Sequence, residues 1–234
     1  MKATNAIVLS SGGVDSTTCL GLAINEFGAK NVLSISFIYG QKHSKELECA
    51  EKVAQYYGVE HRVIDLRDLD LFAGSPCTLL EGSQEAIAHK SYEEQIKESS
   101  TGVVNTYVPF RNGLMLSMIA AVAMSRNPEN ITAIFLGAHA DDAAGNAYPD
   151  CSYAFSCAMT EAIRLGTDGH VQVCMPLIND TKAEVVKLGS SIKVPYELTW
   201  SCYEGKDKPC GKCGTCIDRQ KAFELNGLKD PALL

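Results

Sequence analysis

The fold is decided by Ser10-Ser11-Gly12-Gly13-Val14-Asp15-Ser16-Thr17-Thr18, the stretch between an apolar run at residues 6–9 and a segment of helical periodicity. It predicts a strand, a glycine turn and the start of a helix. Two adjacent glycines let main-chain N–H groups close on an anion without a Cβ in the way. Hydroxyl groups and the positive helix N-terminus add to that attraction. The stretch therefore predicts a binding site for a polyphosphate.

Two common phosphate motifs do not match this turn. No Gly-Lys-Ser/Thr follows it, which excludes a Walker A loop, and the third glycine of the dinucleotide fingerprint is missing. The string Ser-Gly-Gly-x-Asp-Ser instead resembles the PP-loop of the ATP pyrophosphatase superfamily, whose members activate a carbonyl or carboxyl oxygen as its adenylate. The alternative is an ordinary turn in which Asp15 and Ser16 cap the helix. The resemblance implies ATP contacts from the whole segment: Ser10, Ser11, Gly12, Gly13, Val14, Asp15, Ser16, Thr17, Thr18, Cys19 and Leu20.

Four thiols near the end of the chain predict a metal site. Cys202, Cys210, Cys213 and Cys216 contain two C-x-x-C turns that share Cys213. Four thiolates suit one tetrahedral Zn²⁺ per chain with a structural role. An iron–sulfur cluster is the main rival interpretation. Disulfides are not expected, because no apolar leader precedes the first strand and a reducing cytoplasmic location is the default.

Composition narrows the class of protein. The chain has 234 residues, of which 46% are hydrophobic, and a formal net charge of −7. This is enough apolar material for a core, and no apolar run approaches the roughly 18 residues that span a bilayer. The acidic balance argues against direct nucleic-acid binding, which depends on neutralising phosphates with Lys and Arg. Small-molecule substrates fit the charge better.

Alternating strand and helix patterns predict an α/β fold with a doubly wound, mostly parallel, Rossmann-like sheet. The expected strands lie at about 5–10, 32–38, 61–66, 131–136 and 171–175, and the expected helices at about 15–27, 44–57, 114–124, 153–165 and 181–190. A polar insertion at about 67–105 is expected to form a lid with a short helix near 84–97. Residues 137–151 are expected to form a loop. The chain is thus divided into a nucleotide-binding part at 1–198 and a small C-terminal zinc-binding segment at 199–234.

Further clusters at the expected strand ends extend the resemblance to one family. They are residues 39–43 (Tyr-Gly-Gln-Lys-His), 108–112 (Val-Pro-Phe-Arg-Asn), 148–151 (Tyr-Pro-Asp-Cys), 182–184 (Lys-Ala-Glu) and the four-cysteine tail. Together with the glycine turn they resemble the 7-cyano-7-deazaguanine synthases (QueC family). That resemblance implies an adenine nucleotide alpha hydrolase-type fold. It also implies an ATP-dependent carbon–nitrogen ligase that converts 7-carboxy-7-deazaguanine and ammonia to the nitrile in queuosine or archaeosine synthesis, with Mg²⁺ and zinc and as a homodimer.

The chemistry assigns expected roles to individual residues. Nitrile formation needs two adenylations, so donors to phosphate matter more than a nucleophile; Arg111 and Lys182 are expected to offset the charge at phosphorus, and Asp15 to contribute a metal contact. Asp150 is expected to accept the ring N–H and the exocyclic amine of a purine-like edge. The resemblance adds Tyr148 and Asp142 as substrate contacts.

Several alternatives stay open at this point. Arg111 also suits a surface ion pair, Lys182 a solvated first-turn lysine, and Asp150 a cap for the helix that begins near Ser152. Asp141 and Asp142 suit either Mg²⁺ or solvent, and His43 either an adenine pocket or a helix cap. Cys151 suits packing better than a thioester nucleophile. The rival functions are a PP-loop tRNA-modifying ligase or thiolase, an amide-forming synthetase that stops after one adenylation, and a non-catalytic nucleotide-binding module.

Overall fold

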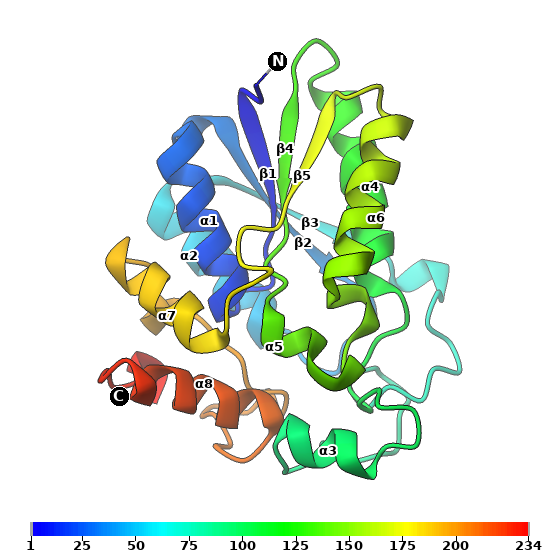
Figure 1. The fold of residues 1–234 in the computed structure, drawn as a ribbon, viewed down its shortest axis with the longest axis vertical. Coiled ribbons are helices and arrows are strands. Elements are labelled where there is room, and N and C mark those ends of the chain that lie inside the picture. Colours follow the sequence, from blue (N-terminus) through cyan, green and yellow to red (C-terminus); the bar gives the residue numbers. More distant parts are fainter. Residues whose placement is uncertain (1, 234) are drawn as a thin grey trace.

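The computed structural model describes residues 2–233 and contains one five-stranded sheet in the order β3-β2-β1-β4-β5 (Figure 1). All four strand pairs are parallel. The order reverses at β1 and β4, so the sheet is doubly wound and Rossmann-like, as the sequence predicts. The strands are β1 (Asn5–Leu9), β2 (Val32–Ile38), β3 (Glu60–Asp65), β4 (Thr132–Phe135) and β5 (Val171–Cys174).

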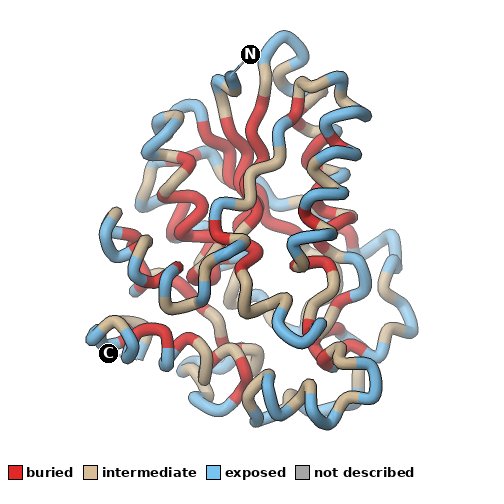
Figure 2. Tube along the Cα trace, in the orientation of Figure 1, coloured by how far each residue is buried: buried red, intermediate tan, exposed pale blue. Residues whose placement is uncertain are grey.

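Helices cover both faces of the sheet, because side chains alternate between the faces along each strand. Ala6 and Val8 pack into the core beneath α1 (Val14–Phe27), α2 (Lys45–Tyr57) and α7 (Lys182–Ser191). Ile7 and Leu9 pack into the opposite core, beneath α4 (Arg111–Arg126) and α6 (Tyr153–Gly166). Figure 2 shows the resulting band of buried chain through the central strands, which is typical of a parallel sheet covered on both sides.

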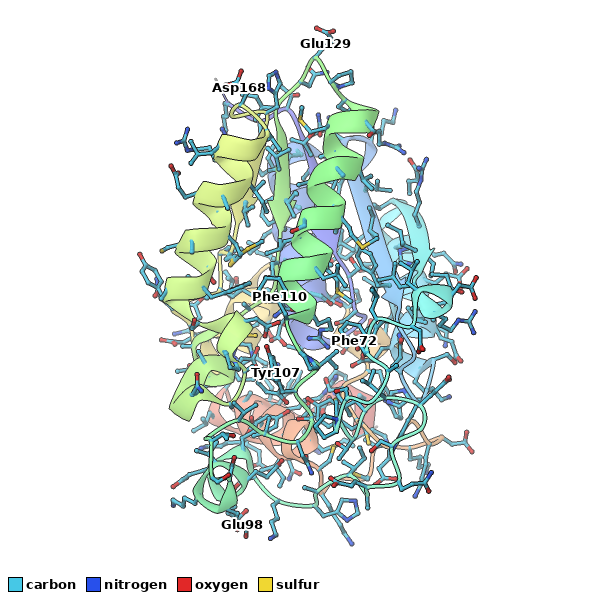
Figure 3. All side chains as sticks on the ribbon, turned by 90° about the vertical axis from the view of Figure 1, so that its right-hand side faces the viewer. Phe72, Glu98, Tyr107, Phe110, Glu129 and Asp168 are labelled. Atoms are coloured by element: carbon cyan, nitrogen blue, oxygen red, sulfur yellow. The ribbon has the colours of Figure 1, made fainter. Side chains whose placement is uncertain are left out.

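The remaining helices gather at the carboxyl ends of the strands. They are α3 (Tyr92–Glu98), α5 (Ala140–Ala143) and α8 (Gly214–Leu225). In Figure 3, Glu98 of α3 lies at this end, whereas Glu129 and Asp168 mark the opposite end of the sheet. The insertion also covers the end of β2, where the N–H of Lys42 donates to the carbonyl of Leu79 at 2.9 Å. These segments close over the edge at which doubly wound folds bind their ligands.

Two predicted helix starts and one predicted loop are wrong. The insertion helix starts at Tyr92 rather than near residue 84, because Ser91 and Glu94 form a capping box there. The helix expected at 114–124 starts three residues earlier, at Arg111. Residues 137–151 are not one loop, since they contain α5 and two short 3₁₀ turns, Ala144–Asn146 and Pro149–Cys151.

The four-cysteine part of the chain packs against the nucleotide-binding part. Phe223 of α8 is 2% exposed and joins the same core as β1 and α1. The main-chain N–H of Trp200 donates to the carbonyl of Gly12 at 2.9 Å, so this part of the chain also holds the glycine turn. Residues 1 and 234, the outer limits of the two predicted parts, lie outside the described chain. No helix within residues 2–233 is long and apolar enough to cross a membrane.

Candidate active site

The turn between β1 and α1 is closed by its own hydroxyl groups. The N–H of Ser11 donates to Oγ of Ser16 at 3.2 Å, and the N–H of Gly13 donates to Oγ of Ser11 at 3.2 Å. Gly12 has φ +84°, and a Cβ there would lie 2.2 Å from the carbonyl oxygen of Glu46. Glycine is therefore required for the turn to lie against the first turn of α2.

Only part of the predicted ATP-binding string faces open space. Ser10, Ser11, Gly13, Asp15 and Ser16 line cavities, whereas Gly12, Val14, Thr17, Thr18, Cys19 and Leu20 do not. Cys19 and Leu20 pack in the core between α1 and the sheet instead. The first half of the string therefore lines the cavities, and the second half anchors the helix that follows. We call residues 10–16 the cradle.

A cluster of alternating charges lies beside the cradle. The Nζ of Lys182 donates to Asp15 Oδ2 at 2.5 Å, and its main-chain N–H donates to Asp141 Oδ2 at 2.7 Å. His139 is 3% exposed, and its Nε2 lies 3.7 Å from Asp15 Oδ1 and 3.3 Å from Asp142 Oδ1. The structure therefore brings together two predicted site residues, Asp15 and Lys182, and shows that Asp141 accepts the first N–H of α7, whose N-cap is Thr181.

The pKa of each group in this cluster depends on its burial and on the charges of its neighbours. Burial alone would raise the pKa of Asp15, but the Lys182 ammonium and His139 outweigh burial and hold that pKa below its usual value. Burial opposes the charge on Lys182 as well, yet Asp15 and Asp142 raise the pKa of Lys182. Asp142 differs, because burial dominates and raises its pKa. The Asp15–Lys182 pair therefore stays charged at neutral pH.

Two adjoining cavities meet at the cradle. We call the first, of about 190 Å³, the apolar chamber, because Leu9, Ile35, Phe37, Met115 and Leu136 line it. We call the second, of about 170 Å³, the polar chamber; its lining includes His43, Tyr148, Lys182, Tyr203 and Asp218. Ser11, Asp15, Tyr39, Gln41, Glu46, Arg111, Asp142 and Cys151 line both chambers. The two chambers therefore differ in polarity and meet at the glycine turn.

Arg111 lies at this junction on the first turn of α4. Its Nη1 donates to the hydroxyl of Tyr39 at 3.2 Å, and the guanidinium lies 5.8 Å from the Tyr39 ring centroid. Although burial disfavours the charge, Tyr39 and Asp150 raise the pKa of Arg111, which keeps it cationic. The surface ion pair that the sequence allowed for Arg111 is absent among residues 2–233.

Asp150 holds the start of α4. Its Oδ2 accepts the N–H of Asn112 at 2.9 Å, its side chain is 5% exposed, and it lines neither chamber. The alternative that Asp150 caps the next helix is wrong, because Ser152 caps α6 itself by accepting from Phe155 N at 3.2 Å. One carboxylate oxygen of Asp150 is thus engaged within the protein, and Asp150 is linked to the position of Arg111 through the first turn of α4.

Four hydroxyl groups join distant segments at the wall of the polar chamber. The Tyr92 and Tyr203 hydroxyl oxygens lie 2.7 Å apart, those of Tyr148 and Tyr203 3.2 Å apart, and Thr106 Oγ1 lies 2.6 Å from Tyr148. Burial raises the pKa of Tyr92 and of Tyr203 well above the usual value, so both stay protonated. The predicted substrate residue Tyr148 therefore lines the chamber as part of a cluster that ties the insertion to the four-cysteine segment.

His43 and Cys151, whose roles the sequence leaves open, both line the polar chamber. His43 lines the polar chamber and not the apolar one. Cys151 is 6% exposed, and burial raises its pKa well above the usual value. The amide of Asn112 also donates to its sulfur at 3.3 Å. A thiol that resists ionisation is a poor nucleophile, which favours packing for Cys151.

Sequence reasoning missed three residues that the fold brings to the site. His139 lies four residues beyond the end of β4, and its position near a strand end was the available signal. Glu46 and Tyr203 had no such signal, because one is in a polar helix turn and the other is in the irregular chain between cysteines. Burial raises the pKa of Glu46 to about 7, against the opposing effects of Arg111 and Lys182.

The four predicted metal ligands converge. All four sulfur atoms lie within 4.8 Å of one another, and those of Cys210 and Cys216 are 4.0 Å apart. A tetrahedral ion with Zn–S bonds of about 2.3 Å would hold its sulfurs roughly 3.8 Å apart. The N–H groups of Lys212 and Cys213 donate to the sulfur of Cys210 at 3.4 and 3.3 Å, which favours a thiolate there. The donor set fits one tetrahedral ion, whereas a cluster with one iron per thiolate needs a wider spacing.

A family model and individual relatives match this chain over nearly its whole length, and they point to the same family. Residues 5–227 match the family model of "Queuosine biosynthesis protein QueC". The chain is 40% identical to the 7-cyano-7-deazaguanine synthase of Hahella chejuensis over 227 residues, which cover 97% of the chain and 91% of that protein. It is also 40% identical to the enzyme of the same name from Oceanobacillus iheyensis, covering 99% and 98% of the two chains.

One solved structure has a fold similar to that of this chain. The NMN synthetase of Francisella tularensis superposes with a TM-score of 0.51 at 13% identity and covers 97% of this chain and 79% of its own. At this identity the similarity concerns the fold alone.

Proposed function

The chain belongs to the QueC family, and we propose on that premise that it is an ATP-dependent ligase that converts 7-carboxy-7-deazaguanine and ammonia to 7-cyano-7-deazaguanine. The observation that carries the proposal is the sequence identity of 40% over nearly the whole length of two 7-cyano-7-deazaguanine synthases. The site supports it physically, since a phosphate cradle lies between an apolar and a polar chamber.

The residues of the junction suit adenylate formation. We assign the adenine ring to the apolar chamber, the pyrophosphate to Ser11, Gly13 and Ser16, and the deazaguanine substrate to the polar chamber. Arg111 and Lys182 supply fixed positive charge at the junction, where charge builds up on the α-phosphate during attack by the substrate oxygen. Because both cations are held by protein groups before ATP binds, little reorganisation is needed in the transition state.

The same site serves twice. The first adenylation converts the carboxylate to an acyl-AMP, which ammonia attacks to give the amide. The second adenylation activates the amide oxygen, and loss of AMP then leaves the nitrile. Neither activation requires a covalent enzyme intermediate, in agreement with the packed position of Cys151.

Tyr148 and Asp142 are proposed substrate contacts, because both line the polar chamber. Asp150 is proposed to act on the substrate site chiefly by holding α4, since only one of its oxygens remains for a purine-like N–H. Mg²⁺ is proposed to accompany ATP, with Asp15 and Asp142 as candidate ligands. Zn²⁺ is proposed for the four cysteines, where it would supply a closed tetrahedral link and no open position for chemistry.

Homodimer formation, a cytoplasmic location and the absence of direct nucleic-acid binding complete the proposal. Light scattering at several protein concentrations tests the first, and a gel shift with tRNA tests the last.

The deciding experiment is incubation with 7-carboxy-7-deazaguanine, ammonium and Mg-ATP, followed by mass analysis of bases and nucleotides. The expected result is the nitrile, with two AMP and two pyrophosphate released for each molecule formed. Accumulation of the amide with one AMP would instead indicate a synthetase that stops after the first adenylation. ATP binding without turnover would indicate a non-catalytic module.

A further inference from the structure

The conversion of ammonium to a nitrile requires repeated proton removal. A nitrile nitrogen carries no hydrogen, so all four N–H bonds of the ammonium ion that supplies it are broken. General bases that accelerate such transfers need a position next to the reacting atoms and a pKa near the working pH. Under the proposed function, on which this inference rests, a side chain at the site takes a proton when ammonia attacks the acyl-AMP.

Glu46 lies at the junction where that attack would occur. It is in the first turn of α2 and lines both chambers, together with Asp15 and Arg111. Its position is fixed by close packing, because the backbone of α2 lies directly against Gly12 of the cradle. The carboxyl group is thus carried by a helix that cannot move without the phosphate loop.

Glu46 also differs from the other carboxylates at the site. Asp15 pairs with Lys182, and Asp142 lies 3.3 Å from His139. Asp218 lines the polar chamber without reaching the apolar one. The side chain of Glu46 makes no hydrogen bond or ion pair with any group in residues 2–233.

We propose that Glu46 is the catalytic residue that accepts a proton from the attacking ammonia nitrogen during amide formation. The nitrogen lone pair forms the C–N bond, and the bond from the acyl carbon to AMP breaks with its electron pair on the departing oxygen. One N–H bond breaks, which leaves its electron pair on nitrogen and its proton on a Glu46 oxygen. The proton passes to water once AMP has left.

Electrostatics support this role. Burial raises the pKa of Glu46 to about 7 although Arg111 and Lys182 oppose the rise, so the group both accepts and releases protons at neutral pH. The titratable and charged groups around it come from α1, α2, α4, α7 and the chain after β2 and β4. They are Asp15, Tyr39, His43, Cys49, Arg111, His139, Asp142, Tyr148, Cys151 and Lys182. Tyr92 of α3, Tyr203 and Asp218 of α8 complete the titratable lining of the polar chamber.

The test separates adenylation from ammonia transfer in Glu46→Gln, which keeps the size of the side chain. Exchange of labelled pyrophosphate into ATP with 7-carboxy-7-deazaguanine measures the first step. Single-turnover amide formation at saturating ammonium, from pH 6 to 9, measures the second. We expect exchange within about threefold of the unchanged protein, and amide formation slower by about 10²–10⁴-fold without a rise in rate near pH 7. Glu46→Asp should restore part of the rate.

The matched control is Glu51→Gln, an exposed position on the same helix that should leave both steps unchanged. Equal losses of exchange and amide formation in Glu46→Gln, or an amide step that keeps its rate and pH profile, would overturn the proposal. Failure of the unaltered protein to make amide or nitrile would instead refute the proposed function, and this is seen before any variant is measured.

Discussion

The hydroxyl groups of Tyr92 and Tyr203 lie 2.7 Å apart and join the insertion to the four-cysteine segment. These residues are 111 positions apart in the sequence, and neither belongs to a motif. Because Tyr203 also contacts the Tyr148 hydroxyl, one side chain connects three segments that line the polar chamber.

Tyr203→Phe should therefore loosen the wall of that chamber. Loss of one buried hydroxyl with two partners should cost about 1 kcal/mol of unfolding free energy. Amide hydrogen exchange in α3 should quicken, and KM for the carboxylate substrate should rise several-fold more than KM for ATP. Tyr56→Phe, whose ring is 59% exposed, is the control. Unchanged exchange in α3 would show that the hydroxyl cluster does not hold the insertion.

Lys182→Met should slow adenylation by at least about 10²-fold, because a fixed cation at the phosphate is lost.

The same variant should also change how the unfolding free energy depends on pH. Lys182 holds the pKa of Asp15 low, so the pair contributes stability above the unfolded pKa of Asp, about 3.9, and loses it as pH falls through the folded value. The variant should thus be less stable than the unchanged protein at pH 7, and the gap should narrow towards pH 3. Urea titrations at both pH values check this, with exposed Lys187→Met as control.

The sequence was sufficient to predict the glycine turn between β1 and α1, the five strands and the convergence of the four cysteines, because each depends on local spacing. Asp150 shows what spacing cannot supply. The sequence predicts a contact with a purine-like edge, with a cap for the following helix as the alternative, whereas tertiary packing places the carboxylate on the N–H of Asn112, 38 residues earlier. Glu46 was missed for a related reason, since the tertiary contact of α2 with Gly12 brings it to the chambers, and its neighbours in sequence give no sign of this.

Asp150→Asn tests the two roles of that side chain. An amide replaces the charged acceptor of the Asn112 N–H, so we expect a loss of about 1 kcal/mol in unfolding free energy, as for other helix caps. If α4 shifts, Arg111 shifts with it, and kcat should fall while both KM values change by similar factors. A rise of more than tenfold in KM for the deazaguanine substrate, with KM for ATP unchanged, would instead show that Asp150 contacts the purine-like edge directly.

Asp230→Ala should be strongly destabilising. Asp230 pairs with Arg219 of α8 at 2.7 and 2.9 Å, and both side chains are 5% exposed. Removal leaves a buried guanidinium without its counter-charge, which costs about 3–5 kcal/mol. Glu161→Ala breaks a pair with Arg164 of similar length but more than half exposed, and should leave the unfolding free energy nearly unchanged. Similar losses of unfolding free energy in both variants would contradict this.

The four cysteines are expected to hold one Zn²⁺ per chain that orders the chamber wall. Thiolates at Cys202, Cys210, Cys213 and Cys216 close the coordination shell, so the ion has no position for substrate. The same segment holds the cradle, because Trp200 N–H donates to the Gly12 carbonyl. Cys213→Ser should therefore lose zinc and weaken ATP binding together, whereas Cys157→Ser, at an exposed thiol, should keep both. Metal analysis and ATP titration are the measurements. A coloured, iron-containing protein, or a metal-free variant that still binds ATP normally, would exclude this role.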